Sequence, residues 1–66
     1  MPRKIRELIA DLRRAGFMLD RQAGSHRQFV HPKVGTLTVS GNEGHDAKHY
    51  QEKQVRQAIG KIPKND

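Results

Sequence analysis

The sequence predicts an α+β fold with the element order α-β-β-β-α, in which two helices cover one face of a three-stranded antiparallel sheet. Apolar residues recur at helical spacing near both ends of the chain, and they alternate along the segments in between. Turn residues separate the alternating segments. A chain of 66 residues, 33% of them hydrophobic, can form one small hydrophobic core. We therefore expect residues 1–66 to form a single domain.

The first helix is indicated by apolar residues that share one helical stripe, namely Ile5, Leu8, Ile9 and Leu12. Pro2 suits the first turn of a helix, where its missing N–H costs nothing. Gly16 follows the periodic segment, and glycine readily takes the left-handed conformation that often ends a helix. The pattern predicts a helix from about Arg3 to Ala15.

The pattern changes to a period of two after this helix. Residues 17–20 alternate, and the chain then turns at Ala23-Gly24-Ser25. A second alternating segment runs from His26 to His31, where Pro32 ends it because proline cannot donate a ladder hydrogen bond. Residues 36–40 are rich in β-branched side chains and predict a third strand. The three strands are expected to form an antiparallel meander.

The second strand is expected to present two different faces. Phe29 is its strongest candidate for the core, and Arg27 and His31 share that face because side chains alternate along a strand. The opposite face carries His26, Gln28 and Val30. His26 should therefore point away from the core, on the face of the sheet that the helices leave open.

A second helix is predicted near the carboxyl end of the chain. Residues 41–44 form a glycine-containing loop, and Asp46 is expected to cap the following helix. The apolar stripe of this helix consists of Gln51, Val55, Ala58, Ile59 and Ile62. Gly60 or Pro63 closes it.

Composition narrows the classes of protein that fit this chain. Thirteen Lys and Arg against seven Asp and Glu give a net charge of +6, which favours a polyanionic partner, either a nucleic acid or an acidic protein. The absence of cysteine excludes a disulfide framework and a cysteine-ligated zinc site, and it favours the reducing cytoplasm. No apolar run is long enough for a membrane span or a secretory signal, so we expect a soluble protein without a membrane partner.

The tripeptide Gly24-Ser25-His26 places an imidazole directly after a tight turn. Histidine exchanges protons readily near neutral pH. Cleavage of RNA needs a base for the 2′-hydroxyl proton, a donor for the departing 5′-oxygen and positive charge near the phosphate. We hypothesise that His26 is the catalytic proton-transfer group and that Ser25 orients the turn. The alternative is a histidine that only closes the hairpin.

The residues expected to bind substrate lie near His26 in the sequence or share its strand face. Basic side chains among them would contact phosphate groups. They are Ser25, Arg27, Arg21, Lys33 and Gln28.

Several of these segments together resemble the HicA family of toxins, also called YcfA-like mRNA interferases. The resemblance rests on the Gly16-Phe17 junction, on Gly24-Ser25-His26 after the first strand, on the strand that ends at His31-Pro32, and on the final basic helix. Residues 40–45 depart from the family, in which many members have a proline and then a histidine at this point.

The resemblance implies the fold of a double-stranded-RNA-binding domain and an endoribonuclease that cleaves mRNA without a metal ion. It implies that His26 is the catalytic residue and that cleavage arrests translation until a HicB-type antitoxin binds the enzyme. The implied partners are RNA and a HicB-like antitoxin, and no small-molecule cofactor is expected.

Two other classes of function fit the composition. A non-catalytic RNA-binding module would bind the shape of RNA through phosphates and 2′-hydroxyls, and its binding would survive loss of His26. A small basic adaptor would bind an acidic protein and not RNA. His45 and His49 are spaced as two ligands on one helix face, but a zinc site needs more ligands than two, so no metal site is predicted.

Overall fold

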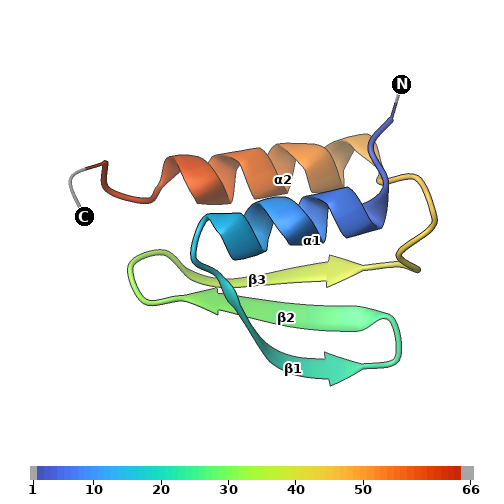
Figure 1. The fold of residues 1–66 in the computed structure, drawn as a ribbon, viewed down its shortest axis with the longest axis horizontal. Coiled ribbons are helices and arrows are strands. Elements are labelled where there is room, and N and C mark those ends of the chain that lie inside the picture. The colour runs from blue at the N-terminus through green and yellow to red at the C-terminus, as the bar shows by residue number, and fades with distance from the viewer. Residues whose placement is uncertain (1, 65–66) are drawn as a thin grey trace.

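A computed structural model describes residues 2–64 and confirms the predicted order of elements. The elements are α1 (Ile5–Arg14), β1 (Met18–Ala23), β2 (His26–His31), β3 (Gly35–Ser40) and α2 (His49–Gly60). The strands form one antiparallel sheet in the order β1-β2-β3, and both helices lie on the same face of it (Figure 1). Within residues 2–64, the other face of the sheet carries no helix.

The core lies between the helices and the sheet. Phe29 at the centre of β2 is fully buried, and the α1 stripe packs over it with apolar residues from α2 and β3. The buried apolar residues are Ile5, Leu8, Ile9, Leu12, Phe17, Phe29, Val39, Ala47, Val55 and Ala58. The helical stripes predicted from apolar spacing therefore face the sheet.

Backbone groups at both ends of α1 form hydrogen bonds with residues nearby in the sequence. The Lys4 backbone N–H donates to the Glu7 side chain, with 2.7 Å between nitrogen and oxygen. At the other end, Gly16 has a φ of +101°, and the Phe17 N–H donates to the Leu12 carbonyl at 2.9 Å. This is a Schellman motif, which the glycine makes possible. It ends the helix and directs the chain into β1.

A β-bulge in β1 decides which of its side chains share a face with β2. Leu19 pairs with Phe29, but the next paired residue is Arg21, opposite Gln28, so Asp20 is the extra residue. Without the bulge, Arg21 would share the covered face with Leu19. The bulge turns Arg21 to the open face of the sheet.

The segment between β3 and α2 is fastened to the start of α1. The Ile5 N–H donates to the His45 carbonyl at 2.9 Å, and the Ala47 N–H donates to the Arg3 carbonyl at 2.6 Å. The prediction that Asp46 caps α2 is wrong. Its carboxylate pairs with Lys4, 2.7 Å from Nζ, because the segment before α2 runs antiparallel to the residues that precede α1.

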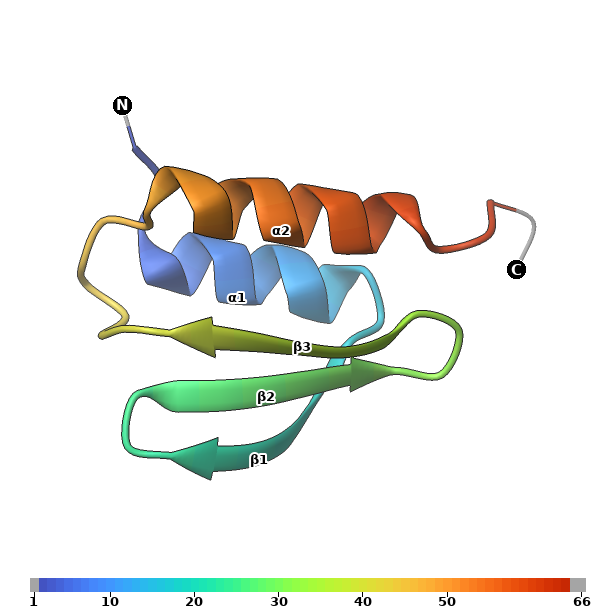
Figure 2. The same ribbon diagram turned by 180° about the vertical axis from the view of Figure 1, so that it is seen from behind.

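Lys48 is the residue that precedes α2, and its N–H donates to the side-chain oxygen of Gln51 at 2.8 Å. Four features lie at the same end of the molecule: the starts of the two helices, the loop after β3 and the β1–β2 turn (Figures 1 and 2).

Arg27 is a buried charged residue that joins two segments at this end. Its side chain lies on the helix-covered face of β2, and the residue is 8% exposed. Nη1 donates to the Gly41 carbonyl at 2.8 Å and to the Ser25 carbonyl at 3.3 Å, and Nη2 lies 3.7 Å from a Glu43 carboxylate oxygen. The guanidinium thus fastens the β1–β2 turn to the segment that follows β3.

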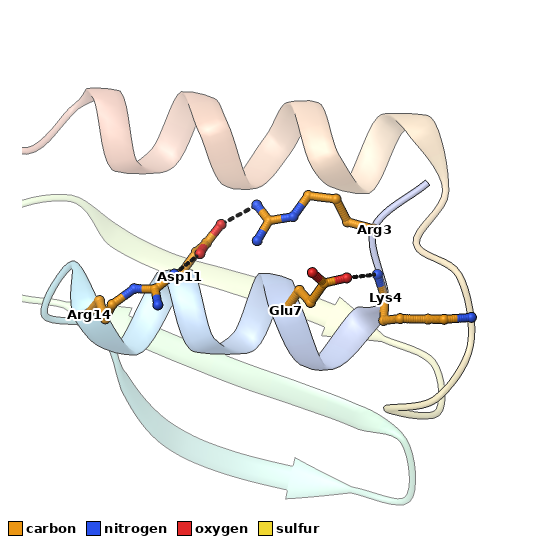
Figure 3. Close-up of polar contacts among 5 residues, drawn as sticks. All are labelled: Arg3, Lys4, Glu7, Asp11 and Arg14. Carbon is orange, nitrogen blue, oxygen red and sulfur yellow. Dashed lines mark hydrogen bonds and ion pairs between the residues drawn. The ribbon is translucent and has the colours of Figure 1, made fainter. Parts of the chain in front are cut away.

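Asp11 on α1 lies between two arginines (Figure 3). It accepts hydrogen bonds from Arg3 and Arg14. The hydrogen bond from Arg3 is the main cause that lowers the pKa of Asp11 below its ordinary 3.8; Arg14 adds to it, and partial burial opposes it. The same contact raises the pKa of Arg3. This network ties the segment before α1 to the last turn of the helix.

Substitution of Arg27 by Ala is expected to lower the free energy of unfolding by about 2–4 kcal/mol, because charged hydrogen bonds and the buried stem are lost together. Arg21→Ala is the matched control, since Arg21 is exposed on the neighbouring strand, and it should change the unfolding free energy by less than about 0.5 kcal/mol. Urea unfolding followed by circular dichroism measures both values. Equal stabilities of the two variants would contradict the structural role of Arg27.

The stability provided by Asp11 is expected to depend on pH. Because its pKa in the folded chain lies below that in the unfolded chain, the unfolded state binds the proton more readily as the pH falls. The contribution is therefore fully present above about pH 5 and disappears as the pH falls below 3.8. Asp11→Asn should lower the free energy of unfolding by up to about 1 kcal/mol at pH 7 and by almost nothing near pH 2. A difference that is the same at both pH values would contradict this explanation.

Candidate functional site

The β1–β2 turn places His26 at the first position of β2. Ala23 pairs with His26, which leaves Gly24 and Ser25 as a two-residue hairpin loop. Gly24 has a φ of +59°, whereas Ser25 keeps a negative φ. This is the pattern of a type II′ turn, which favours glycine at its first central position and matches the twist of the flanking strands. The Gly-Ser sequence therefore fixes the backbone that carries His26.

His26 is exposed on the open face of the sheet, as its alternation with Phe29 predicts. Its ring nitrogen Nδ1 lies 2.8 Å from Oγ of Ser40, the cross-strand partner of His26 on β3. The other ring nitrogen, Nε2, has no hydrogen-bond partner within residues 2–64. One nitrogen is thus held by the protein, and the other is left for a bound molecule.

Two of the predicted substrate-binding residues lie beside His26 on the open face. Arg21 on β1 and Gln28 on β2 are cross-strand partners. This pair is adjacent, on the same face of the sheet, to the pair that Ala23 forms with His26. Arg21 is the diagonal neighbour of His26, at a typical separation of about 7–8 Å, which a long side chain can span. A positive charge, an amide and an imidazole therefore share one surface.

The other predicted residues are not brought together with the imidazole. The Arg27 side chain lies on the opposite, covered face of the sheet, where it binds backbone carbonyls. Lys33 lies in the β2–β3 turn. This turn is at the opposite end of the sheet from the β1–β2 turn, which precedes His26 (Figure 1). The Ser25 carbonyl accepts the Gly41 N–H at 3.2 Å as well as the bond from Arg27, so Ser25 contributes to the turn through its backbone.

Ser40 is a neighbour of His26 that sequence reasoning did not single out. The alternation along residues 36–40 places Ser40 on the open face with Thr36 and Thr38. The signal for its pairing with His26 is the length of the β2–β3 connection, which fixes the register of the two strands. Neither the alternation nor the composition alone identifies this partner.

Two surface hollows lie away from His26. One lies between the helices and includes Arg3, Asp11 and Glu52 in its lining, and the other lies beside His31 and Ile62. The imidazole is instead part of an exposed sheet surface, whereas small-molecule sites are typically concave.

The remaining histidines do not extend the site. In the part of the chain that the structure describes, no three His, Cys, Asp or Glu side chains are close enough to hold a metal ion together. His31 is buried, its Nδ1 accepts the Lys33 N–H at 3.0 Å, and its ring packs against Phe17. His45 and His49 are exposed. None of the helices among residues 2–64 is long and apolar enough to cross a membrane.

Comparison with known proteins identifies the family. A family model described as the HicA toxin of bacterial toxin–antitoxin systems matches residues 5–61, which is more than half of the chain and includes all of α1, the three strands and α2. No match was found among curated proteins or solved structures. The match includes the turn, the open sheet face and both helices described above. The chain therefore belongs to the HicA toxin family of bacterial toxin–antitoxin systems.

Proposed function

We propose that this toxin is an endoribonuclease that cleaves mRNA, with His26 as its proton-transfer group. The observation that carries the proposal is the exposed imidazole on the open sheet face, with Nδ1 held by Ser40 and Nε2 unpartnered within the described residues. The neighbouring cross-strand pair on this face, Arg21 and Gln28, supplies a positive charge and a polar contact. Membership of the HicA toxin family supports the same class of enzyme.

The proposed reaction is attack of a ribose 2′-hydroxyl on the adjacent phosphate. Nε2 of neutral His26 takes the 2′-hydroxyl proton while the 2′-oxygen forms a bond to phosphorus. The bond from phosphorus to the 5′-oxygen breaks, and that oxygen takes a proton from the imidazolium or from water. The products are a 2′,3′-cyclic phosphate and a 5′-hydroxyl. Arg21 offsets the negative charge that grows on the phosphate oxygens.

The location of His26 favours a polymer as substrate. The imidazole belongs to neither surface hollow, and it sits on a sheet surface that an extended strand can cross. A net charge of +6 attracts the phosphates of RNA and makes binding weaker as the salt concentration rises. These properties suit a single RNA strand better than a small metabolite.

An antitoxin is the protein partner that the family implies. We propose that it is a HicB-type protein whose acidic surface complements the positive charge of the toxin. The proposed complex prevents cleavage by keeping RNA away from His26. RNA and this antitoxin meet the toxin in the cytoplasm, where mRNA is translated.

The His26→Ala variant is expected to cleave RNA at least about 10²-fold more slowly than the wild type, because removal of a general acid–base group costs about 10²–10⁴-fold in rate. His49→Ala is the matched control, since it removes an exposed imidazole from α2. Both variants should keep the wild-type circular dichroism spectrum. Induced expression should arrest growth for the wild type and for His49→Ala, and not for His26→Ala.

The outcomes separate the proposed function from its alternatives. Cleavage at the wild-type rate by folded His26→Ala would overturn the assignment of His26. If the wild type, His26→Ala and His49→Ala all bind RNA and none of them cleaves it, a non-catalytic RNA-binding module would be favoured. A chain with neither activity would favour the adaptor. The proposed chemistry also requires that RNA with a 2′-deoxyribose at the scissile nucleotide resists cleavage.

A further inference from the structure

We propose that Ser40 is a positioning residue for His26, and that its hydroxyl keeps the proton on Nδ1 so that only Nε2 exchanges protons with substrate. The inference rests on the proposed ribonuclease function. Its basis is the distance of 2.8 Å between Nδ1 and the Ser40 Oγ. The two residues face each other across β2 and β3, at the end of the sheet beside the β1–β2 turn.

The backbone of Ser40 is held in place from the helix layer. The Ser40 carbonyl accepts a hydrogen bond from Nε2 of Gln51, with 2.7 Å between nitrogen and oxygen. Gln51 is buried in the first turn of α2, and its side-chain oxygen accepts the Lys48 N–H. The start of α2 therefore fixes the strand position that carries the hydroxyl.

The residue after Ser40 is held as well. The Gly41 N–H donates to the Ser25 carbonyl, and the Gly41 carbonyl accepts from the buried Arg27. Ser25 is also the residue that precedes His26. These contacts fasten the backbone on both sides of the Ser40–His26 pair, so the geometry between the hydroxyl and the imidazole is defined by the fold.

The chemistry of an imidazole determines which way this hydrogen bond must run during the reaction. A serine hydroxyl can donate or accept, and a neutral imidazole carries one N–H. Nε2 must be unprotonated to take the 2′-hydroxyl proton, so the ring proton is then on Nδ1 and is donated to Ser40. In the imidazolium that follows, Nδ1–H still donates to Ser40. The same bond thus persists in both states while Nε2 alone gains and loses a proton.

The size of the expected effect follows from the neutral charge of the hydroxyl. A carboxylate at this place would stabilise the imidazolium strongly, as the aspartate does in a Ser-His-Asp triad. A hydroxyl supplies one neutral hydrogen bond, which is worth a factor of about 2–12. Loss of Ser40 Oγ should therefore reduce kcat modestly and should leave the surface that binds RNA intact.

The test compares Ser40→Ala, Ser40→Thr and Thr36→Ala on an RNA oligonucleotide that the wild-type chain cleaves. Ser40→Ala should lower kcat about threefold to tenfold and leave KM within about twofold, because one neutral hydrogen bond is lost. Ser40→Thr retains a hydroxyl and should restore kcat. Thr36→Ala is the matched control, since it removes a hydroxyl from the open face of the same strand, opposite Val30, and it should cleave as the wild type does.

A second measurement reads the proton directly. Nitrogen-15 NMR of the His26 ring should show the proton on Nδ1 in the wild type at a pH where the ring is neutral, and a shift of the proton towards Nε2 in Ser40→Ala. An unchanged distribution of the proton in Ser40→Ala would overturn the inference. Equal kcat values for Ser40→Ala and the wild type, or a kcat of Ser40→Thr as low as that of Ser40→Ala, would also overturn it.

The two measurements distinguish failure of the inference from failure of the proposed function. A wild-type chain that cleaves RNA, together with a Ser40→Ala variant that behaves identically, overturns the role of Ser40 and leaves the ribonuclease in place. A wild-type chain that cleaves no RNA overturns the ribonuclease and with it the catalytic purpose of Ser40. The NMR spectra then still decide whether Ser40 sets the proton position on His26.

Discussion

Side chains on neighbouring positions of β2 must point to opposite faces of the sheet, and the site depends on this constraint. Phe29 is fully buried beneath the helices, together with Arg27 and His31 on the same face. Burial of Phe29 therefore sends His26 and Gln28 to the open face. A slip of one residue in the pairing would expose the phenyl ring and bury the imidazole. The hydrophobic core and the location of His26 are thus set by the same register.

The covered face supports the open one through polar contacts as well as through the core. A buried guanidinium is costly unless its hydrogen bonds are satisfied. Arg27 meets this requirement by binding carbonyls on both sides of the His26–Ser40 pair, and among residues 2–64 no buried side-chain nitrogen or oxygen lacks a partner. The end of the sheet that carries His26 is also the end at which both helices begin (Figure 2). The proposed catalytic surface therefore lies at an end of the sheet where hydrogen bonds from Arg27 and Gln51 join separate segments.

Local patterns were sufficient to predict the fold. The apolar stripes of both helices, the left-handed Gly16 and the exposed position of His26 follow from spacing and alternation, which are properties of neighbouring residues. The features that could not be predicted from the sequence depend on contacts between distant segments. Asp46 pairs with Lys4 because the segment before α2 runs antiparallel to the residues that precede α1, and no local signal indicates that pairing.

The candidate site shows the same division. The alternation along β2 already places Arg27 on the face of Phe29, but its charge and its place beside His26 suggest a phosphate ligand; the contact with the Gly41 carbonyl comes from a distant segment and has no local signal. The bulge at Asp20, which turns Arg21 to the open face, has no distinctive residue such as glycine to indicate it. The Ser40–His26 pair requires the register of β2 and β3, which is fixed only when the hairpin is formed.

We propose that the open face of the sheet contacts RNA while the helices support it from behind. NMR mapping with an RNA that carries 2′-O-methyl groups, and so resists cleavage, would locate the bound RNA on the protein. We expect the largest chemical-shift changes at His26, Gln28 and Arg21, with small changes along the outer surfaces of α1 and α2. Changes confined to the helices, with the open face undisturbed, would contradict it.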